Sequence, residues 1–237
     1  MKKTMFILCI LVAIVCCIPM SAQAKLVRSN KLIVIDAGHQ GRGNSAREPI
    51  GPGARSKKAK VASGTYGRYS KTAESALNLK VAKKLATELK KRGYKVKMIR
   101  TSQKVNISNS KRALMANKWG ANAFIRIHAN GSTASRVHGA CTMAPASNNP
   151  FMKKSNIKKS QKLSSCLLRS FCKATKANNR GVLKYNNMSG INWAKVPVSI
   201  IEMGYMTNRS EDLKMASASY QTKMVKGMAN GLDAYFS

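Results

Sequence analysis

Acidic residues are scarce in this sequence. Only 8 of 237 residues are Asp or Glu, against 43 Lys and Arg, so the formal net charge is +35 at pH 7. A charge of this size exceeds what solubility requires and concentrates polyanions around a protein. Two interpretations are open. Either the chain binds an anionic polymer or an anionic lipid surface, or its lysines, which are spread along the sequence, form a solvated surface without a single partner.

Cysteines are also few and are poorly spaced for a structural role. Three of the six fall within the first 17 residues, which leaves Cys141, Cys166 and Cys172 with no C-x-x-C spacing. Cys166 and Cys172 are expected on one helix, where six residues separate their Cα atoms by about 9 Å along the axis, too far for a disulfide. The pattern indicates neither a disulfide framework nor a cysteine zinc site.

Long hydrophobic runs are absent after the N-terminus. Lys2 and Lys3 precede the apolar run MFILCILVAIVCCIPM, which is followed by Ala22-Gln23-Ala24. This order predicts a secretory signal peptide over residues 1–24. An uncleaved anchor is the alternative, but the run is short for a span of about 20 residues and contains Pro19. We therefore expect a secreted or cell-wall protein with no stable membrane span after processing. Such a protein meets anionic wall polymers more readily than nucleic acid, which is not expected as a partner.

The sequence has no internal repeat and no linker, so residues 25–237 are expected to form one domain. Apolar and amphipathic segments alternate, which predicts an α/β fold with a mostly parallel, twisted sheet flanked by helices on both faces. The expected strands cover residues 31–36, 94–100, 123–128, 139–143 and 196–203. The expected helices cover about 72–92, 108–119, 155–177 and 218–236, with a short turn that begins at residue 210.

Residues 41–67 break this pattern. The segment holds six of the 16 glycines and two prolines, and it shows no periodicity. Residues 41–46 match the dinucleotide fingerprint G-x-G-x-x-A, but Pro49 and Pro52 stand where a phosphate-binding helix should begin, so the match is weak. A basic, glycine-rich loop of this length is interpreted as a functional rim that suits an anionic ligand, or as a disordered insertion.

Five polar side chains stand at the ends of expected elements. Asp36 and His39 follow the first strand, His128 ends the strand AFIRIH, and Glu202 ends the strand VPVSIIE. The carboxyl ends of parallel strands share one edge of a sheet, where such folds bind their ligands. Glu74 opens the helix that leaves the long loop and is expected near the same edge. The other helical acids are interpreted as surface or capping groups: Glu88, Glu211, Asp212 and Asp233.

Two histidines and a carboxylate form a ligand set that suits hydrolytic zinc with a fourth position for water. A second carboxylate is then free to act as general base and general acid. His39, Glu74, His128 and Glu202 supply these groups, and no H-E-x-x-H motif is present. The opposing interpretation makes each histidine a structural residue and Glu202 a capping or surface acid. His138 has no comparable placement and is expected to be structural or exposed.

The ordered motifs IDAGHQG, AESALNLKVAKKLATELKKRGYKV, IRIHANG and VPVSIIEMGYMTNRSED resemble those of the zinc-dependent N-acetylmuramoyl-L-alanine amidases of the amidase-3 type. The resemblance extends from about Lys31 to Phe236. It implies that His39, Glu74 and His128 bind Zn²⁺ and that Glu202 is the catalytic carboxylate. Many relatives have a proline before the glycine of the first motif and a second glycine after the histidine. Neither departure removes a ligand.

The resemblance implies an enzyme that cleaves the amide between N-acetylmuramic acid and the L-alanine of the stem peptide in peptidoglycan. Two alternatives remain open at this point. The first is a zinc peptidase or deacetylase that acts on another wall component. The second is a non-enzymatic, basic protein that binds the wall or nucleic acid. Intact ligand candidates in all four motifs favour the enzyme.

Overall fold

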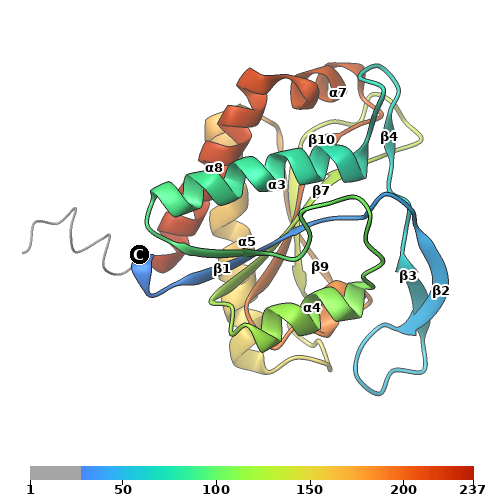
Figure 1. The fold of residues 1–237 in the computed structure, drawn as a ribbon, viewed down its shortest axis with the longest axis vertical. Coiled ribbons are helices and arrows are strands. Elements are labelled where there is room, and N and C mark those ends of the chain that lie inside the picture. The colour runs from blue at the N-terminus through green and yellow to red at the C-terminus, as the bar shows by residue number, and fades with distance from the viewer. Residues whose placement is uncertain (1–27) are drawn as a thin grey trace, which may run out of the picture.

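The computed structural model describes residues 28–237, and the expected signal peptide, residues 1–24, lies outside this range. Its centre is a six-stranded sheet with strand order β6-β1-β7-β10-β8-β9 (Figure 1). These strands are β1 (Leu32–Ala37), β6 (Lys95–Met98), β7 (Ala123–Asn130), β8 (Ala140–Pro145), β9 (Asn179–Tyr185) and β10 (Val198–Tyr205). The helices are α3 (Glu74–Lys91), α4 (Asn109–Lys118), α5 (Lys154–Thr175), α6 (Ser189–Asn192), α7 (Arg209–Ala216) and α8 (Ala218–Phe236).

The sheet is mostly parallel, as expected. Strands β6, β1, β7 and β10 run in one direction, whereas β8 pairs antiparallel with β10 and β9 pairs parallel with β8. The carboxyl ends of β1, β7 and β10 therefore meet at one edge. The predicted α/β class with helices on both faces is confirmed.

Side chains that point alternately to the two faces of the sheet divide the hydrophobic core into two layers. Ile33, Ile35 and Ile125 pack against α3, α5 and α8, while Val34 and Phe124 pack on the opposite face with α4 and α6. Because side chains alternate across a sheet, the even-numbered residues of β7 and β10 point to the α4 side. The candidate site residues at the ends of these strands fall on that face.

Helix α3 shows how closely the apolar spacing determines the packing. Leu77, Val81, Leu85 and Leu89 recur every four residues and are at most 3% exposed. Complete burial of each such side chain stabilises the fold by about 1.5–3 kcal/mol. This stripe fixes the helix against β1, β6 and β7, and it places the first residue, Glu74, at the edge where β1 and β7 end.

The segment 41–67 is ordered, and about half of it is strand. It forms an antiparallel hairpin of β2 (Asn44–Pro49) and β3 (Lys57–Val61), followed by the short strand β4 (Tyr66–Gly67), which pairs with β5 (Thr72–Ala73). The interpretation as a disordered insertion is wrong. Glu48 is 5% exposed and accepts hydrogen bonds from the Ser110 backbone and hydroxyl, and Trp193 donates to the Pro49 carbonyl. Contacts with α4 and α6 thus order a hairpin whose own sequence lacks strand periodicity.

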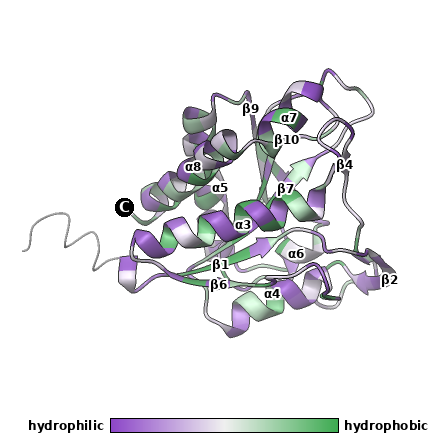
Figure 2. Ribbon diagram, turned by 45° about the horizontal axis from the view of Figure 1, so that its top comes forward, coloured by the Kyte–Doolittle hydropathy of each residue, from purple (hydrophilic) through white to green (hydrophobic). Residues whose placement is uncertain are grey.

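The remaining elements follow the hydropathy of the chain. Figure 2 shows hydrophobic residues along the central strands and hydrophilic residues on the outer faces of α3 and α4. Strand β9 and helix α6 had no signal in the sequence, because NRGVLKY lacks alternation and α6 spans only four residues. Within residues 28–237, no helix is both long and apolar enough to cross a membrane.

Candidate active site

The strand register brings two of the predicted site residues side by side. His128 of β7 and Glu202 of β10 are direct neighbours in the parallel ladder, and adjacent strands lie about 4.8 Å apart. Both side chains point to the α4 face, where the strands end in a cleft. Sheet pairing alone therefore sets the position of Glu202 relative to His128.

Three of the four predicted site residues form a compact triad. His39 Nε2 lies 3.1 Å from Glu74 Oε1, His128 Nδ1 lies 3.1 Å from the same oxygen, and the two nitrogens are 3.2 Å apart. Tetrahedral zinc with bonds of about 2.0–2.1 Å needs neighbouring ligand atoms about 3.3 Å apart. The three atoms thus have the spacing of three tetrahedral zinc ligands.

The ring protons of the two histidines are placed so that lone pairs remain between the three converging atoms of the triad. His39 Nδ1 lies 2.7 Å from the Ala62 carbonyl oxygen, and because a carbonyl only accepts, Nδ1 carries the proton and Nε2 is free in the neutral ring. Burial lowers the pKa of His128, so the His128 ring is neutral and holds one proton. At most one proton therefore lies between the three converging atoms, as a metal site requires.

Glu74 is held in its ionised form. Burial favours protonation, but His128 and His39 outweigh burial and keep the pKa of the carboxyl well below its usual range. The carboxylate also accepts hydrogen bonds from the Ala129 backbone, the Asn78 amide and the Thr65 backbone. Hydrogen bonds of this kind orient a ligating carboxylate.

The segment after the hairpin closes one side of the triad. Ala62 binds the His39 ring and Thr65 binds the Glu74 carboxylate, with Gly64 between them at φ +87°. A Cβ at Gly64 would lie 2.8 Å from Glu74 Oε2, so only glycine fits this turn at this distance. The long segment, which the sequence presented as a loop, thus positions two of the three candidate ligands.

Buried arginines fix the turn that carries His39. His39 has φ +58°, an unusual backbone conformation for a residue with a side chain. Arg100 donates to the carbonyls of Ala37 and Gly38, and Arg112 donates to the carbonyls of Ala37 and His39. These bonds satisfy every carbonyl of the turn from residue 37 to residue 39, and they hold the strained conformation in place.

Asp36, expected at the same rim, has a structural place under it. Its carboxylate is fully buried between Arg112, at 2.6 Å, and Arg126, at 2.9 Å. Burial favours the neutral carboxyl, but the two guanidinium groups outweigh it and hold the pKa of Asp36 well below its usual range. Asp36 therefore orients the arginines and does not reach the triad's centre.

Glu202 differs from Glu74 in having no partner. It is 7% exposed, and its Oε2 atom is buried without a hydrogen bond within the described range. Burial, aided by the charge of Glu74 and opposed by Arg126, raises the pKa of Glu202 to about 8. A divalent cation at the triad opposes this rise. A carboxyl that gains and loses a proton near neutral pH suits general acid and base work.

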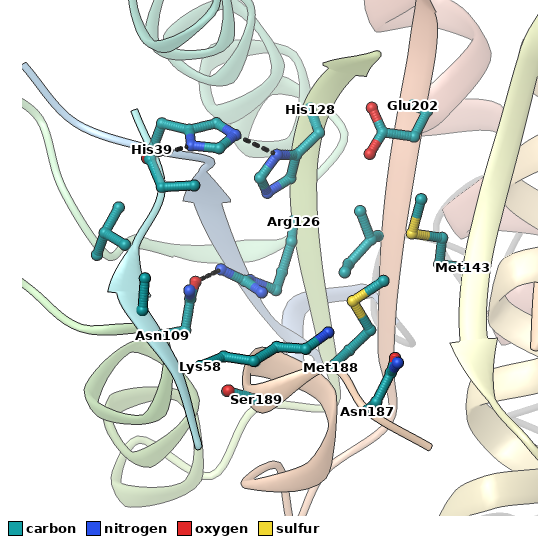
Figure 3. Close-up of a pocket in the computed structure, with 15 residues that line it drawn as sticks. His39, Lys58, Asn109, Arg126, His128, Met143, Asn187, Met188, Ser189 and Glu202 are labelled. Carbon is teal, nitrogen blue, oxygen red and sulfur yellow. Dashed lines mark hydrogen bonds between the residues drawn. The ribbon is translucent and has the colours of Figure 1, made fainter. Parts of the chain in front are cut away.

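His39 and His128 of the triad line one cleft of about 410 Å³ together with Glu202 (Figure 3). Strand β3 forms one wall, β7 and β10 form the floor, and the segment 187–190 forms the far side. Sequence reasoning missed Lys58, Asn109 and Arg126 in this lining. One signal was available, because Arg126 interrupts the apolar strand AFIRIH two residues before His128.

Two expectations about other polar residues have different outcomes. His138 is exposed, as predicted, and contacts only the Arg136 carbonyl through its ring. The interpretation of Asp212 as a surface or capping group is wrong: Asp212 is 1% exposed and accepts hydrogen bonds from the backbones of Tyr69 and Ser70 and from the Ser70 hydroxyl. The N-cap of α7 is Asn208. Asp212 instead ties the turn after β4 to α7.

Comparison with known protein families decides between the enzyme classes. The model of the amidase-3 family, described as N-acetylmuramoyl-L-alanine amidase, matches residues 33–234. The chain belongs to this amidase family. The match covers every element that carries the triad and Glu202, so the resemblance of the four motifs is confirmed at the level of the family.

Individual relatives agree with the family. The amidase described here is 26% identical over 215 residues to the uncharacterized protein YqiI of Bacillus subtilis, covering 91% of this chain and 89% of that protein. It is 27% identical over 220 residues to the N-acetylmuramoyl-L-alanine amidase Rv3717 of Mycobacterium tuberculosis, covering 87% of this chain and 86% of that protein. The crystal structure of the amidase Ami1 from Mycobacterium smegmatis superposes with a TM-score of 0.79 at 19% identity, covering 88% of this chain and 98% of that chain. This likeness shows the common fold.

Proposed function

We propose that this protein is a zinc-dependent peptidoglycan hydrolase that cleaves the amide between N-acetylmuramic acid and the L-alanine of the stem peptide. His39, Glu74 and His128 hold the zinc through the three converging atoms described above. When bound, the zinc supplies Lewis-acid chemistry for a water molecule and for the amide carbonyl. Membership of the family and the spacing and protonation of the triad support this assignment.

Glu202 acts as the general base and then as the general acid. Its carboxylate takes a proton from the attacking water and returns one to the amine that leaves with L-alanine. The observation that carries this role is the buried, unpartnered Oε2 atom of Glu202 in the cleft that His39 and His128 also line. A buried carboxylate without a hydrogen-bond donor is costly in a resting fold, which points to a partner that arrives with substrate.

Product analysis on purified peptidoglycan tests the bond that is cleaved. An amidase releases new L-alanine amino termini in proportion to digestion and produces no new reducing sugar ends. Release of other amino termini supports a peptidase, and release of acetate supports a deacetylase. Either result would replace the proposed substrate bond while leaving the triad in place.

We propose further that the enzyme is exported and acts at the cell wall, held there by its charge. The signal-like run of residues 5–20 and the relatives described as probable cell wall amidases support this location. In the described part of the chain no lysine forms an ion pair with a carboxylate. This surface attracts anionic wall polymers at long range, and it includes the basic residues of segment 41–67: Arg42, Arg47, Arg55, Lys57, Lys58 and Lys60.

A further inference from the structure

The cleft continues past the triad to a positively charged inner end that the proposed reaction does not use. Arg126 and His128 lie two residues apart on the same face of β7, a spacing of about 6.6 Å along the strand. Lys58 enters from β3, and in Figure 3 its side chain crosses the view between Arg126 and Ser189. We call Lys58 and Arg126 the cationic subsite.

The charge of this subsite is not neutralised by the protein. Asp36 is the only carboxylate bonded to Arg112 and Arg126 among residues 28–237, so one of these two positive charges is left over. Burial, and after it the charge of Arg112, also lowers the pKa of neighbouring Arg100 to about 10. Lys58 forms no ion pair within residues 28–237, and Glu48, which lies opposite it in the β2–β3 register, accepts hydrogen bonds from Ser110 instead. The inner end therefore favours an anion.

Arg126 is fixed but has donor capacity left. Its Nε donates to Asp36 and its Nη2 donates to Asn109 at 2.6 Å, while Nη1 forms no hydrogen bond with residues 28–237. A Cβ at Gly190 would lie 1.8 Å from Nη1, so glycine at this position lets the guanidinium reach the cleft. A donor held in place before substrate arrives loses little entropy when it binds.

The opposite side of the inner end is apolar. Met143, Met188 and Ile200 line it. Charge interactions are stronger where side chains such as these exclude water than at an open surface. Arg126, which is 3% exposed, is therefore better suited to hold one anionic group of the substrate than the exposed lysines of the outer surface are.

We propose that the cationic subsite binds a carboxylate of the peptide that leaves as the amine. This inference rests on the proposed function. Arg126 lies two residues, or about 6.6 Å of strand, from His128, and an extended peptide advances about 3.3–3.6 Å per residue. We therefore assign the bound carboxylate to the residue after the one that carries the scissile nitrogen. The subsite thus selects peptides whose second residue has a free carboxylate over peptides in which that group is a carboxamide.

The test uses two soluble N-acetylmuramoyl dipeptides that differ only in a carboxylate or a carboxamide on the second residue. For the unaltered enzyme we expect kcat/KM to favour the carboxylate by about tenfold, the low end for a hydrogen bond to a charged group. In Lys58→Met the ratio should fall towards one, mainly through a higher KM for the carboxylate substrate. Lys58→Arg should retain most of the preference.

The matched control is Lys57→Met. Lys57 lies next to Lys58 on the same strand, is exposed as Lys58 is and carries the same charge, but does not line the cleft. The proposal expects this variant to keep the preference. An equal fall in both variants would assign the preference to the general field of the protein and overturn the subsite, as would equal hydrolysis of both substrates by the unaltered enzyme. Hydrolysis of neither substrate would instead contradict the proposed function itself.

Discussion

The buried arginines under the cleft and the lysines of the outer surface carry the same charge in opposite settings. Arg100, Arg112 and Arg126 are at most 3% exposed, and each donates several hydrogen bonds to the residues around the triad. The lysines of residues 28–237 form no ion pair, and only Lys84 donates a side-chain hydrogen bond. The buried arginines determine the geometry of the site over a few ångströms. The lysines of the outer surface create an electrostatic field that acts at a distance and is screened by salt.

The largest effect should come from the triad. His39→Ala or His128→Ala should abolish stoichiometric zinc binding, because a site with three protein ligands has no spare donor. Metal analysis of the purified variants measures this, with loss of hydrolysis as the second readout. His138→Ala removes an exposed histidine outside the cleft and should keep both zinc and activity. Full zinc in both triad variants would exclude the assigned site.

The next largest effect should come from the buried arginines under the cleft, and it should be on stability. Arg112→Met leaves the buried carboxylate of Asp36 with one partner in place of two and removes the donors to the turn at His39. Breaking a buried pair in this way costs about 3–5 kcal/mol in the free energy of unfolding. Denaturant titration measures the loss. The neighbouring exposed Lys111→Met should change stability by no more than about 0.5 kcal/mol, and equal losses in the two variants would remove the distinction drawn above.

Each surface lysine should have the smallest effect of the residues considered, and that effect should be on attachment of the protein to the cell wall. The Debye length falls from about 8 Å at physiological salt to about 3 Å at 1 M, so adsorption to isolated walls should collapse as salt rises. Adsorption should also fall after anionic polymers are stripped from the walls. Hydrolysis of a soluble, uncharged fragment should depend much less on salt. Equal wall binding at low and high salt would indicate a specific carbohydrate-binding surface instead.

Periodic positions made much of the fold predictable. The four-residue spacing of α3 and the apolar runs of β1, β7 and β10 encode both burial and direction, so the ends of these strands could be placed at one edge. His39, Glu74 and His128 could be grouped for the same reason. Their mutual distances follow from long-range strand pairing, which is not visible in any local pattern.

The hairpin and the buried acids could not be predicted in this way. Pro49 and the surrounding glycines suppress the strand signal, and β2–β3 is held by tertiary contacts such as the one from Glu48 to Ser110. Asp212 sits at a helix start, where an acid normally caps or faces water, yet it binds a turn that is 142 residues away in the sequence. Arg126 was the detectable exception, as a charged residue in the middle of an apolar strand.

Glu202→Gln tests the division between a fixed catalytic cleft and a diffuse basic surface most directly. Zinc content and the rate of amide cleavage should be measured on the same preparation, with a soluble muramoyl peptide as substrate. The account predicts unchanged zinc and an unchanged fold, together with at least an approximately 10²-fold loss of turnover, the low end for removal of a general acid or base. Near-normal turnover in a variant that retains its zinc would contradict it, because the proton transfers would then be carried out by another group.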